Sequence, residues 1–244
     1  MKKSIQLLVC SAFLVSSIAN AQWSSNEKIT GNGKVTTDTR TTADYDAIKV
    51  SGSFDVDLVA GKEGKITIKG EENLMLYVKV EVEDNVLKIY NQKGSKIRPS
   101  GGKKIQVTIP FEKISELNLS GSGNIKSIDT IKNDKFLAKL SGSGNFTLAF
   151  DTTNLELNLS GSGNAHLKGN TDKFTSKLSG SGNIDAVNLK TKNVDANVTG
   201  SGNSRVNCNE NLVARVSGSG DIKYTGSPEK RDVKVSGSGN ISKA

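Results

Sequence analysis

The feature that most constrains this chain is the motif Ser-Gly-Ser-Gly-Asn, which recurs seven times, with small variations, between Ser120 and Asn240. The copies begin at Ser120, Ser141, Ser160, Ser179, Thr199, Ser217 and Ser236. Successive copies are 21, 19, 19, 20, 18 and 19 residues apart. Near-constant spacing of this size indicates a solenoid, in which each repeat stacks on the next.

The residues that flank the motif alternate between apolar and polar, which is the period of a β-strand. In the first copy Leu117 and Leu119 precede the motif and Ile125 follows it, and most later copies keep apolar residues there. A repeat of 19 residues is too short for a strand–helix–strand unit, which needs roughly 30 residues. We therefore predict an all-β fold, a parallel β-solenoid whose rungs pair at roughly 4.8 Å.

The motif itself is expected to form a corner at which each rung bends. Gly121 and Gly123 share the strand parity of the inward leucines, so the missing side chains let the chain bend inward or adopt a positive φ. The asparagines then point outward and stack as a ladder of amide hydrogen bonds. The predicted ladder contains Asn124, Asn145, Asn164, Asn183, Asn203 and Asn240. Asp221 is expected to interrupt it, as an acceptor between two asparagine donors.

The N-terminus reads as a secretory signal peptide, residues 1–21. Lys2 and Lys3 precede an apolar run, and Ala19-Asn20-Ala21 supplies the small residues of a cleavage site. A membrane anchor would need about 20 apolar residues, and lipidation at Cys10 would place the modified cysteine inside the apolar run. We therefore predict export to the periplasm, the outer membrane or the exterior, with no transmembrane span.

Between the signal peptide and the regular repeats the pattern is less even. Residues 22–112 are predicted to form irregular β structure that caps the solenoid, which then occupies residues 113–244. A degenerate motif copy, Ser51 to Asp55, lies in the first alternating segment, and residues 92–104 are expected to form an exposed loop. Four polar stretches, 168–172, 190–193, 207–211 and 225–229, are expected to form the second turn of each rung.

These features resemble the head GIN domain family of putative auto-transporter adhesins, found mainly in Bacteroidetes-type bacteria. The resemblance rests on the signal peptide, the strand Tyr45 to Leu58 with its degenerate motif, the turn Glu71 to Leu74 and the repeated motif. It covers Tyr45 to Ile241. It implies a right-handed parallel β-helix similar in shape to pectin lyases but without their catalytic residues, and a role in cell adhesion.

Residues that could carry chemistry are scarce, and we predict no catalytic site, metal site or cofactor. The sole histidine, His166, has no cysteine or second histidine at zinc-ligand spacing. The repeat lacks the aspartate of calcium-binding β-solenoids in six of seven copies. Acidic residues fall on alternate rungs, at Glu116, Glu156, Asp195 and Asp232, where a solvated face that pairs with lysines explains them.

The outward position two residues before the motif holds the candidate binding residues Lys139, Lys177, Arg215 and Lys234. Together with the asparagine ladder they favour a non-enzymatic envelope or surface module that binds a glycan or another anionic polymer, but not nucleic acid. Without Lys2 and Lys3 of the signal peptide the chain has 31 basic and 25 acidic residues, a net charge of +6, which favours an anionic partner. Solubility alone would also explain these bases. The alternatives are a polysaccharide lyase or hydrolase on the same scaffold and a purely structural envelope component. Weak end-to-end self-association is expected at the last rung.

Overall fold

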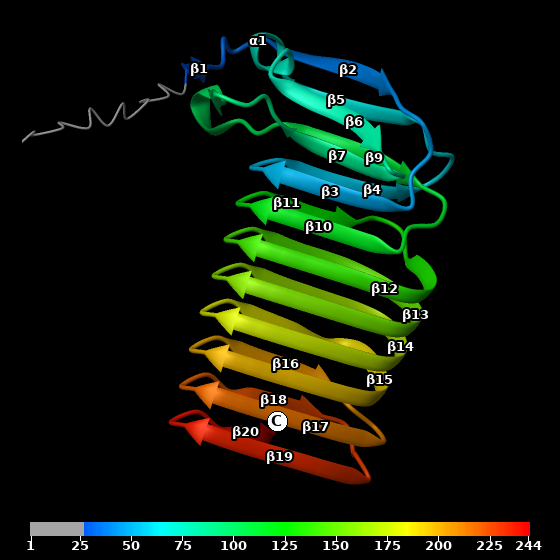
Figure 1. Cartoon of the computed structure of the whole chain (residues 1–244), viewed down its shortest axis with the longest axis vertical. Helices are drawn as coiled ribbons and strands as arrows, with labels where there is room; N and C mark the ends of the chain where they lie inside the picture. The colour runs from blue at the N-terminus through cyan, green and yellow to red at the C-terminus, as the bar shows by residue number, and fades with distance from the viewer. Residues whose placement is uncertain (1–26) are drawn as a thin grey trace, which may run out of the picture.

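The computed structural model describes residues 27–244, so the predicted signal peptide lies outside the described residues. The chain forms a column of stacked β rungs, with about 7 turns of roughly 19 residues, and an irregular cap at the N-terminal end (Figure 1). The predicted parallel β-solenoid is confirmed. None of the helices in the described part of the chain is long and apolar enough to cross a bilayer.

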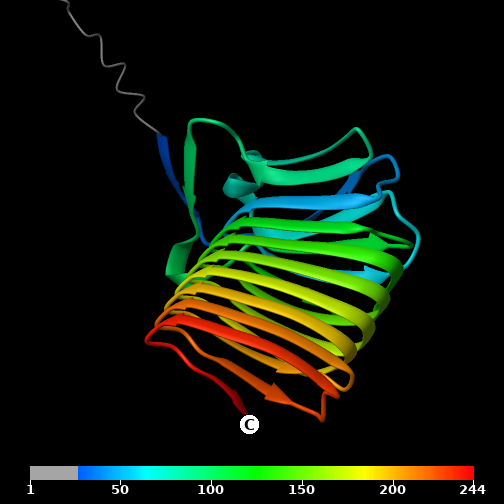
Figure 2. The same ribbon diagram turned by 60° about the horizontal axis from the view of Figure 1, so that its bottom comes forward.

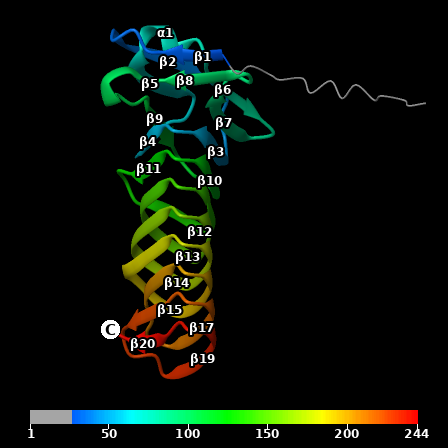
Figure 3. The same cartoon turned by 90° about the vertical axis from the view of Figure 1, so that its left-hand side faces the viewer.

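Each regular rung consists of two strand layers joined by two bends. The strands are β10 (Glu116–Gly121), β11 (Asn124–Ser127), β12 (Ile131–Gly142), β13 (Asn145–Gly161), β14 (Asn164–Gly180), β15 (Asn183–Gly200), β16 (Asn203–Asn207), β17 (Asn211–Gly218), β18 (Ile222–Thr225), β19 (Lys230–Gly237) and β20 (Ile241–Lys243). One bend is the Ser-Gly-Ser-Gly-Asn motif, here called the glycine corner. These corners line the left-hand edge in Figure 1 and face the viewer in Figure 3.

The opposite bend differs from the expected open turn in the first rungs. Residues 168–172 and 190–193 lie inside the continuous strands β14 and β15, whereas near residues 207–211 and 225–229 one strand ends and the next begins. Pairing skips one residue per rung at this bend, Thr153 opposite Asp172 for example, and the buried Thr171 hydroxyl bonds to the Thr153 carbonyl oxygen at 3.3 Å. Side-chain hydroxyls therefore satisfy the backbone where a separate turn was expected.

The cap is woven from the first part of the chain. It contains β1 (Glu27–Thr30), β2 (Val35–Thr41), β3 (Ala47–Gly52), β4 (Asp55–Ala60), β5 (Lys65–Glu71), α1 (Glu72–Met75), β6 (Val78–Glu83), β7 (Val86–Asn91), β8 (Ser95–Arg98), the 3₁₀ turn η1 (Ser100–Gly102) and β9 (Gln106–Phe111). Strands β2, β5 and β6 pair antiparallel, unlike the solenoid strands. The expected loop 92–104 contains β8, which pairs with β1, and η1.

The rungs do not stack in chain order at this end. Strands β3 and β4 pair with β10 and β11 on one side, and with β7 and β9 on the other. The rung formed by β7 and β9 therefore lies beyond the β3–β4 rung, although it comes later in the sequence. Residues 61–115 leave the stack after β4 and return to it above β3, through β7 and β9.

The core lies between the two strand layers, as the view from the C-terminal end shows (Figure 2). In-register apolar columns fill it, and one such column is at most 3 % exposed: Phe136, Leu155, Phe174, Val194 and Leu212. Burial of these columns supplies the main driving force for folding, since apolar burial is worth about 25 cal/mol per Å². The only cysteine among the described residues, Cys208, is buried and unpaired.

Candidate binding faces of the solenoid

The glycine corner is fixed by contacts between successive rungs. The backbone N–H groups of Ser143 and Gly144 both donate to the carbonyl oxygen of Gly121, at 3.0 and 3.1 Å, and the later copies repeat this pattern. The first glycine of each copy has a positive φ, +117° at Gly142, as expected for a glycine-only conformation.

The sequence predicts only a bend at the two glycines, and the structure shows a second reason for them. A Cβ at Gly142 would lie 2.4 Å from the carbonyl oxygen of Gly121, and one at Gly144 would lie 2.4 Å from that of Gly123. The missing side chains thus make room for the backbone of the preceding rung as well as for the bend. Both glycines allow the rungs to stack at this corner and so place the asparagine that follows in register.

The predicted asparagine ladder is present from Asn124 to Asn203 and has a direction, whereas Asn240 takes part only through its backbone N–H. Asn145 Nδ2 donates to Asn124 Oδ1 at 2.7 Å, Asn164 to Asn145 at 3.0 Å, Asn183 to Asn164 at 3.0 Å and Asn203 to Asn183 at 3.3 Å. At the cap end Asn124 donates to the carboxylate of Asp55 at 2.6 Å, which Lys104 also contacts. A carboxylate only accepts hydrogen bonds and therefore closes the ladder.

At the other end Asp221 behaves differently from the expectation. Asn203 does not donate to it. Instead the backbone N–H of Asp221 donates to Asn203 Oδ1 at 3.1 Å, and the N–H of Asn240 donates to Asp221 Oδ1 at 2.8 Å. Backbone amides replace the side-chain donor that aspartate lacks.

We call the outward side of the strands that run into the glycine corner the lysine face. It comprises β10, β17, β19 and the C-terminal halves of β12 to β15. Strand register places the four predicted bases in one column, Lys139, Lys177, Arg215 and Lys234, with Asn158 and Asn197 between them. The column spans five rung steps, roughly 24 Å at the strand spacing.

Two further bases join this column in the cap. Asn118 is opposite Lys49, which in turn is opposite Lys88. Lys49 stands two residues before the degenerate motif copy at Ser51, so its place could have been found from the sequence. Lys88 could not, because its rung contains no copy of the motif.

Ion pairs on the lysine face connect residues of neighbouring rungs. Lys139 Nζ lies 3.0 Å from Glu116 and Lys177 Nζ lies 3.2 Å from Glu156, while Arg215 pairs with Asp232. Three residues of the acidic column thus pair with bases, whereas the fourth, Asp195, accepts a hydrogen bond from Asn197 at 2.8 Å. A hydrogen bond from Asn158, joined by one from Lys177, holds the pKa of Glu156 below its usual value. Partial burial raises the pKa of Glu116, but bonds from Asn118 and Lys139 outweigh it and lower the pKa.

The lysine face is hollowed next to the glycine corner. A depression of about 790 Å³ extends over several rungs, lined among others by Lys49, Lys139, Lys177 and the outward serines Ser120, Ser141, Ser160 and Ser179. The asparagine ladder lies on the far side of the glycine corner, at the start of the opposite strand layer. The bases and the ladder are therefore parted by the corner and do not form one flat surface.

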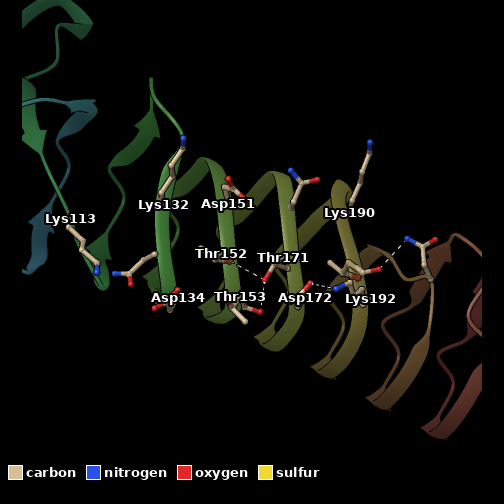
Figure 4. Close-up of a pocket in the computed structure, with 14 residues that line it drawn as sticks. Lys113, Lys132, Asp134, Asp151, Thr152, Thr153, Thr171, Asp172, Lys190 and Lys192 are labelled. Atoms are coloured by element: carbon tan, nitrogen blue, oxygen red, sulfur yellow. Dashed lines mark hydrogen bonds and ion pairs between the residues drawn. The ribbon is translucent and has the colours of Figure 1, made fainter.

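A second hollow, of about 680 Å³, lies at the opposite bend (Figure 4). We call it the threonine groove, after the buried Thr152, Thr171 and Thr191 that form its floor. Thr152 Oγ1 donates to Thr171 Oγ1 at 3.0 Å. Lysine and aspartate side chains border this floor. This groove was not predicted from the sequence, although the spacing of its threonines, 19 and 20 residues apart, indicates it.

Side chains that could bind a metal ion or take part in catalysis are few among the described residues. Within residues 27–244 no group of three or more His, Cys, Asp and Glu side chains is placed to hold a metal ion. His166 points outward from the strand layer opposite the lysine face, with its Nδ1 3.7 Å from Asp185, and its side chain is 60 % exposed.

A comparison with known protein families identifies one family. Residues 44–228 match the sequence profile described as putative auto-transporter adhesin, head GIN domain. No protein among the curated sequences matches the chain.

Several crystal structures are similar over most of the chain. A putative adhesin from Bacteroides fragilis is 26 % identical, with a TM-score of 0.81 over 88 % of this chain and all of that one. A putative lipid binding protein from Parabacteroides distasonis is 28 % identical (TM-score 0.74; 89 % and 100 % covered). A putative adhesin from Parabacteroides merdae is 27 % identical (TM-score 0.70; 89 % and 99 % covered).

Proposed function

Because this chain belongs to the head GIN domain family of putative auto-transporter adhesins, we propose that it is a non-enzymatic envelope or surface protein whose lysine face binds an anionic glycan. The observation that carries the proposal is the straight column of bases, in register on a rigid scaffold and next to a hollow. Lys139, Lys177, Arg215 and Lys234 are the binding residues that we propose.

A linear anionic chain laid along the solenoid axis would meet Lys139, Lys177 and Arg215 on alternate rungs, at intervals of roughly 10 Å, and Lys234 on the rung after Arg215. Each contact at an exposed site contributes little, typically below about 1 kcal/mol. Contacts on one polymer add up, because after the first has formed the others are intramolecular. Affinity therefore depends on the whole column.

The ion pairs of the lysine face oppose this binding. An incoming anionic group competes with Glu116 for Lys139 and with Glu156 for Lys177. These side chains are between 33 and 61 % exposed, so solvent screens the pairs and the competition is modest. The serines beside the bases and the neighbouring asparagines Asn118, Asn158 and Asn197 add uncharged hydrogen-bonding groups. The asparagines of the ladder, across the corner, already bond to one another and serve the binding face by holding register.

The shared chemistry of the ligand is repeated negative charge, whether on an acidic polysaccharide or on the phosphates of lipopolysaccharide. The experiment is a binding array carrying acidic polysaccharides, lipopolysaccharide and neutral polysaccharides, probed with residues 22–244. We expect the anionic members to bind, and binding to fall sharply when the four bases are all replaced by glutamine. Equal binding of the parent and this variant at low salt would contradict the proposal.

Export is part of the same proposal. We expect the exported protein to begin at Gln22, because signal peptidase would cut after Ala21. The intact mass of the protein isolated from the cell envelope tests this, and a mass that includes Met1 would contradict it.

A further inference from the structure

The threonine groove presents charged side chains of both signs, most of which are unpaired among the described residues, whereas most bases of the lysine face are paired. Two rows of exposed side chains border its threonine floor (Figure 4). One row, in strand register, contains Lys132, Asp151, Asn170 and Lys190. The other contains the residues after each floor position, Asp134, Thr153, Asp172 and Lys192.

Most charged groups in the groove have no partner in the part of the chain that the structure describes. Lys192 pairs with Asp172 at 2.8 Å. Across residues 27–244, neither an ion pair nor a side-chain hydrogen bond is formed by Lys132, Lys190, Asp134 or Asp151, even though Lys132 and Asp151 are opposite each other on adjacent rungs. The lysine face is the reverse case, since three of its four proposed bases are paired. The groove therefore presents carboxylate and ammonium groups that remain available.

The charges in the groove nearly cancel. The lining contains the lysines 113, 132, 190 and 192 and the aspartates 134, 151 and 172, so four positive and three negative charges leave +1. A polyanion would meet the unpaired carboxylates of Asp134 and Asp151, and a polycation would meet the lysines. An uncharged ligand with many hydroxyl groups avoids both, because each hydroxyl can donate to a carboxylate and accept from an ammonium or an amide group.

The shape of the groove favours a linear ligand. The four-rung rows are three rung steps long, roughly 14 Å at the strand spacing, and the rungs repeat donors and acceptors at about the length of a pyranose ring. We propose that the threonine groove binds a short stretch of a neutral linear polysaccharide laid along the solenoid axis, with Asp134 and Asp151 accepting hydrogen bonds from its hydroxyls. This site is distinct from the lysine face in both position and ligand charge.

The test uses residues 22–244 and three neutral oligosaccharides as probes, the hexamers of cellulose, mannan and starch, titrated by calorimetry at low and high salt. We expect at least one hexamer to bind, with an affinity that salt hardly changes because the ligand is uncharged. The variant Asp134→Ala/Asp151→Ala should weaken this binding at least about tenfold, since hydrogen bonds to charged groups are among the stronger ones.

The matched control is Glu72→Ala/Glu229→Ala, which removes two exposed carboxylates outside the groove and should bind like the parent. Circular dichroism melts check that all variants fold. Absence of binding to every hexamer would overturn the inference, and so would equal affinity of the groove variant and the parent. The four-base variant of the lysine face should bind the hexamers normally, so this inference and the proposed function can fail separately.

Discussion

At the scale of single residues, the glycines of the corner are set by the distance between rungs. A Cβ at Gly163 would lie 2.3 Å from the carbonyl oxygen of Gly144 and 2.9 Å from Leu140 Cδ2. Both atoms belong to the packed stack, where neither can move far. The second glycine of each motif copy is thus required by a close approach of backbone to backbone, although its φ is ordinary.

Gly163→Ala is therefore expected to lower the free energy of unfolding by about 1–3 kcal/mol, as overpacking does. The control is Gly61→Ala, because a Cβ there would meet nothing closer than 3.9 Å. That change should be neutral or stabilise slightly, by up to about 1 kcal/mol, through the unfolded chain. Urea unfolding of both variants measures the difference, and equal midpoints would contradict this account of the corner.

Glu71 is the main charged residue of the cap interior and is 1 % exposed. It accepts hydrogen bonds from the N–H of Gly33 at 2.6 Å, and from the N–H and hydroxyl of Ser100 at 2.7 and 2.5 Å. The bond from the Ser100 side chain is the main reason why its pKa is lowered, against the opposing effect of burial. The carboxylate thereby joins the start of β2 to η1.

The pH dependence follows from the direction of this shift. A carboxyl group with a lowered pKa stabilises the fold above its unfolded value, near 4.5, and this stability is lost as the pH falls through the folded value. We expect Glu71→Gln to lower the melting temperature at pH 7 and to flatten its fall as the pH drops below the unfolded value, near 4.5. Glu72→Gln, an exposed neighbour, should leave both unchanged. Parallel melting curves for Glu71→Gln and the parent would contradict the assigned role.

At the scale of the elements, outward side-chain ladders and inward apolar columns contribute differently to the stacking of the rungs. Asn183 donates to Asn164 and accepts from Asn203 at an exposed position. Leu178 is 2 % exposed in the core. Outward ladders therefore contribute to register, and inward columns contribute most of the stability.

Asn183→Leu removes two amide hydrogen bonds, each worth about 1 kcal/mol. Leu178→Ala should cost about 2–5 kcal/mol, because it opens a cavity in a packed core. Chemical denaturation of the two variants should rank them in that order. Midpoints that coincide would mean that the assignment of inner and outer faces is wrong.

The sequence predicts the repeated part of this fold well and the cap poorly. Period-two alternation identifies the buried columns, and motif spacing alone places Lys139 opposite Asn158 and Asn164 opposite Asn183. The cap could not be predicted in this way, because β7 and β9 contain no motif and stack out of chain order on β3 and β4. The threonine groove was not predicted for another reason. The bend stays extended in the structure, but in the sequence its polar residues resemble an ordinary turn.

At the scale of the whole molecule, the two ends of the column differ. The cap covers the first end with antiparallel strands. At the other end Val233 and Val235 of β19 are 49 and 40 % exposed, although the equivalent residues of β17, Ala214 and Val216, are buried. Among the described strands, β19 pairs only with β17, so its outer edge is unpaired.

Self-association through this end remains a prediction. An unpaired strand edge with exposed valines favours pairing with a second copy. Because the cap covers the other end of the column, two copies are expected to pair through their C-terminal ends. Light scattering of residues 22–244 should show a mass that increases with concentration. Val233→Lys should abolish the increase, whereas Val213→Lys, on the outward side of β17, should not. A strict monomer at high concentration would refute the prediction.

The central claim is that the column of bases on the lysine face binds an anionic polymer through additive contacts. The direct measurement is the dissociation constant of residues 22–244 for polygalacturonate, titrated at several salt concentrations. The variants are Lys139→Gln, Lys139→Gln/Lys177→Gln and the full four-base replacement. The control, Lys126→Gln/Lys223→Gln, removes two exposed lysines from the opposite strand layer. A further variant, Glu116→Gln/Glu156→Gln, releases two bases from their ion pairs.

We expect affinity and its salt dependence both to decrease stepwise as bases are removed. Glu116→Gln/Glu156→Gln should bind more tightly than the parent, and the control should bind almost as the parent does. Equal affinity of the parent and the four-base variant at low salt would contradict binding by this column, as would a loss in the control as large as that in Lys139→Gln/Lys177→Gln.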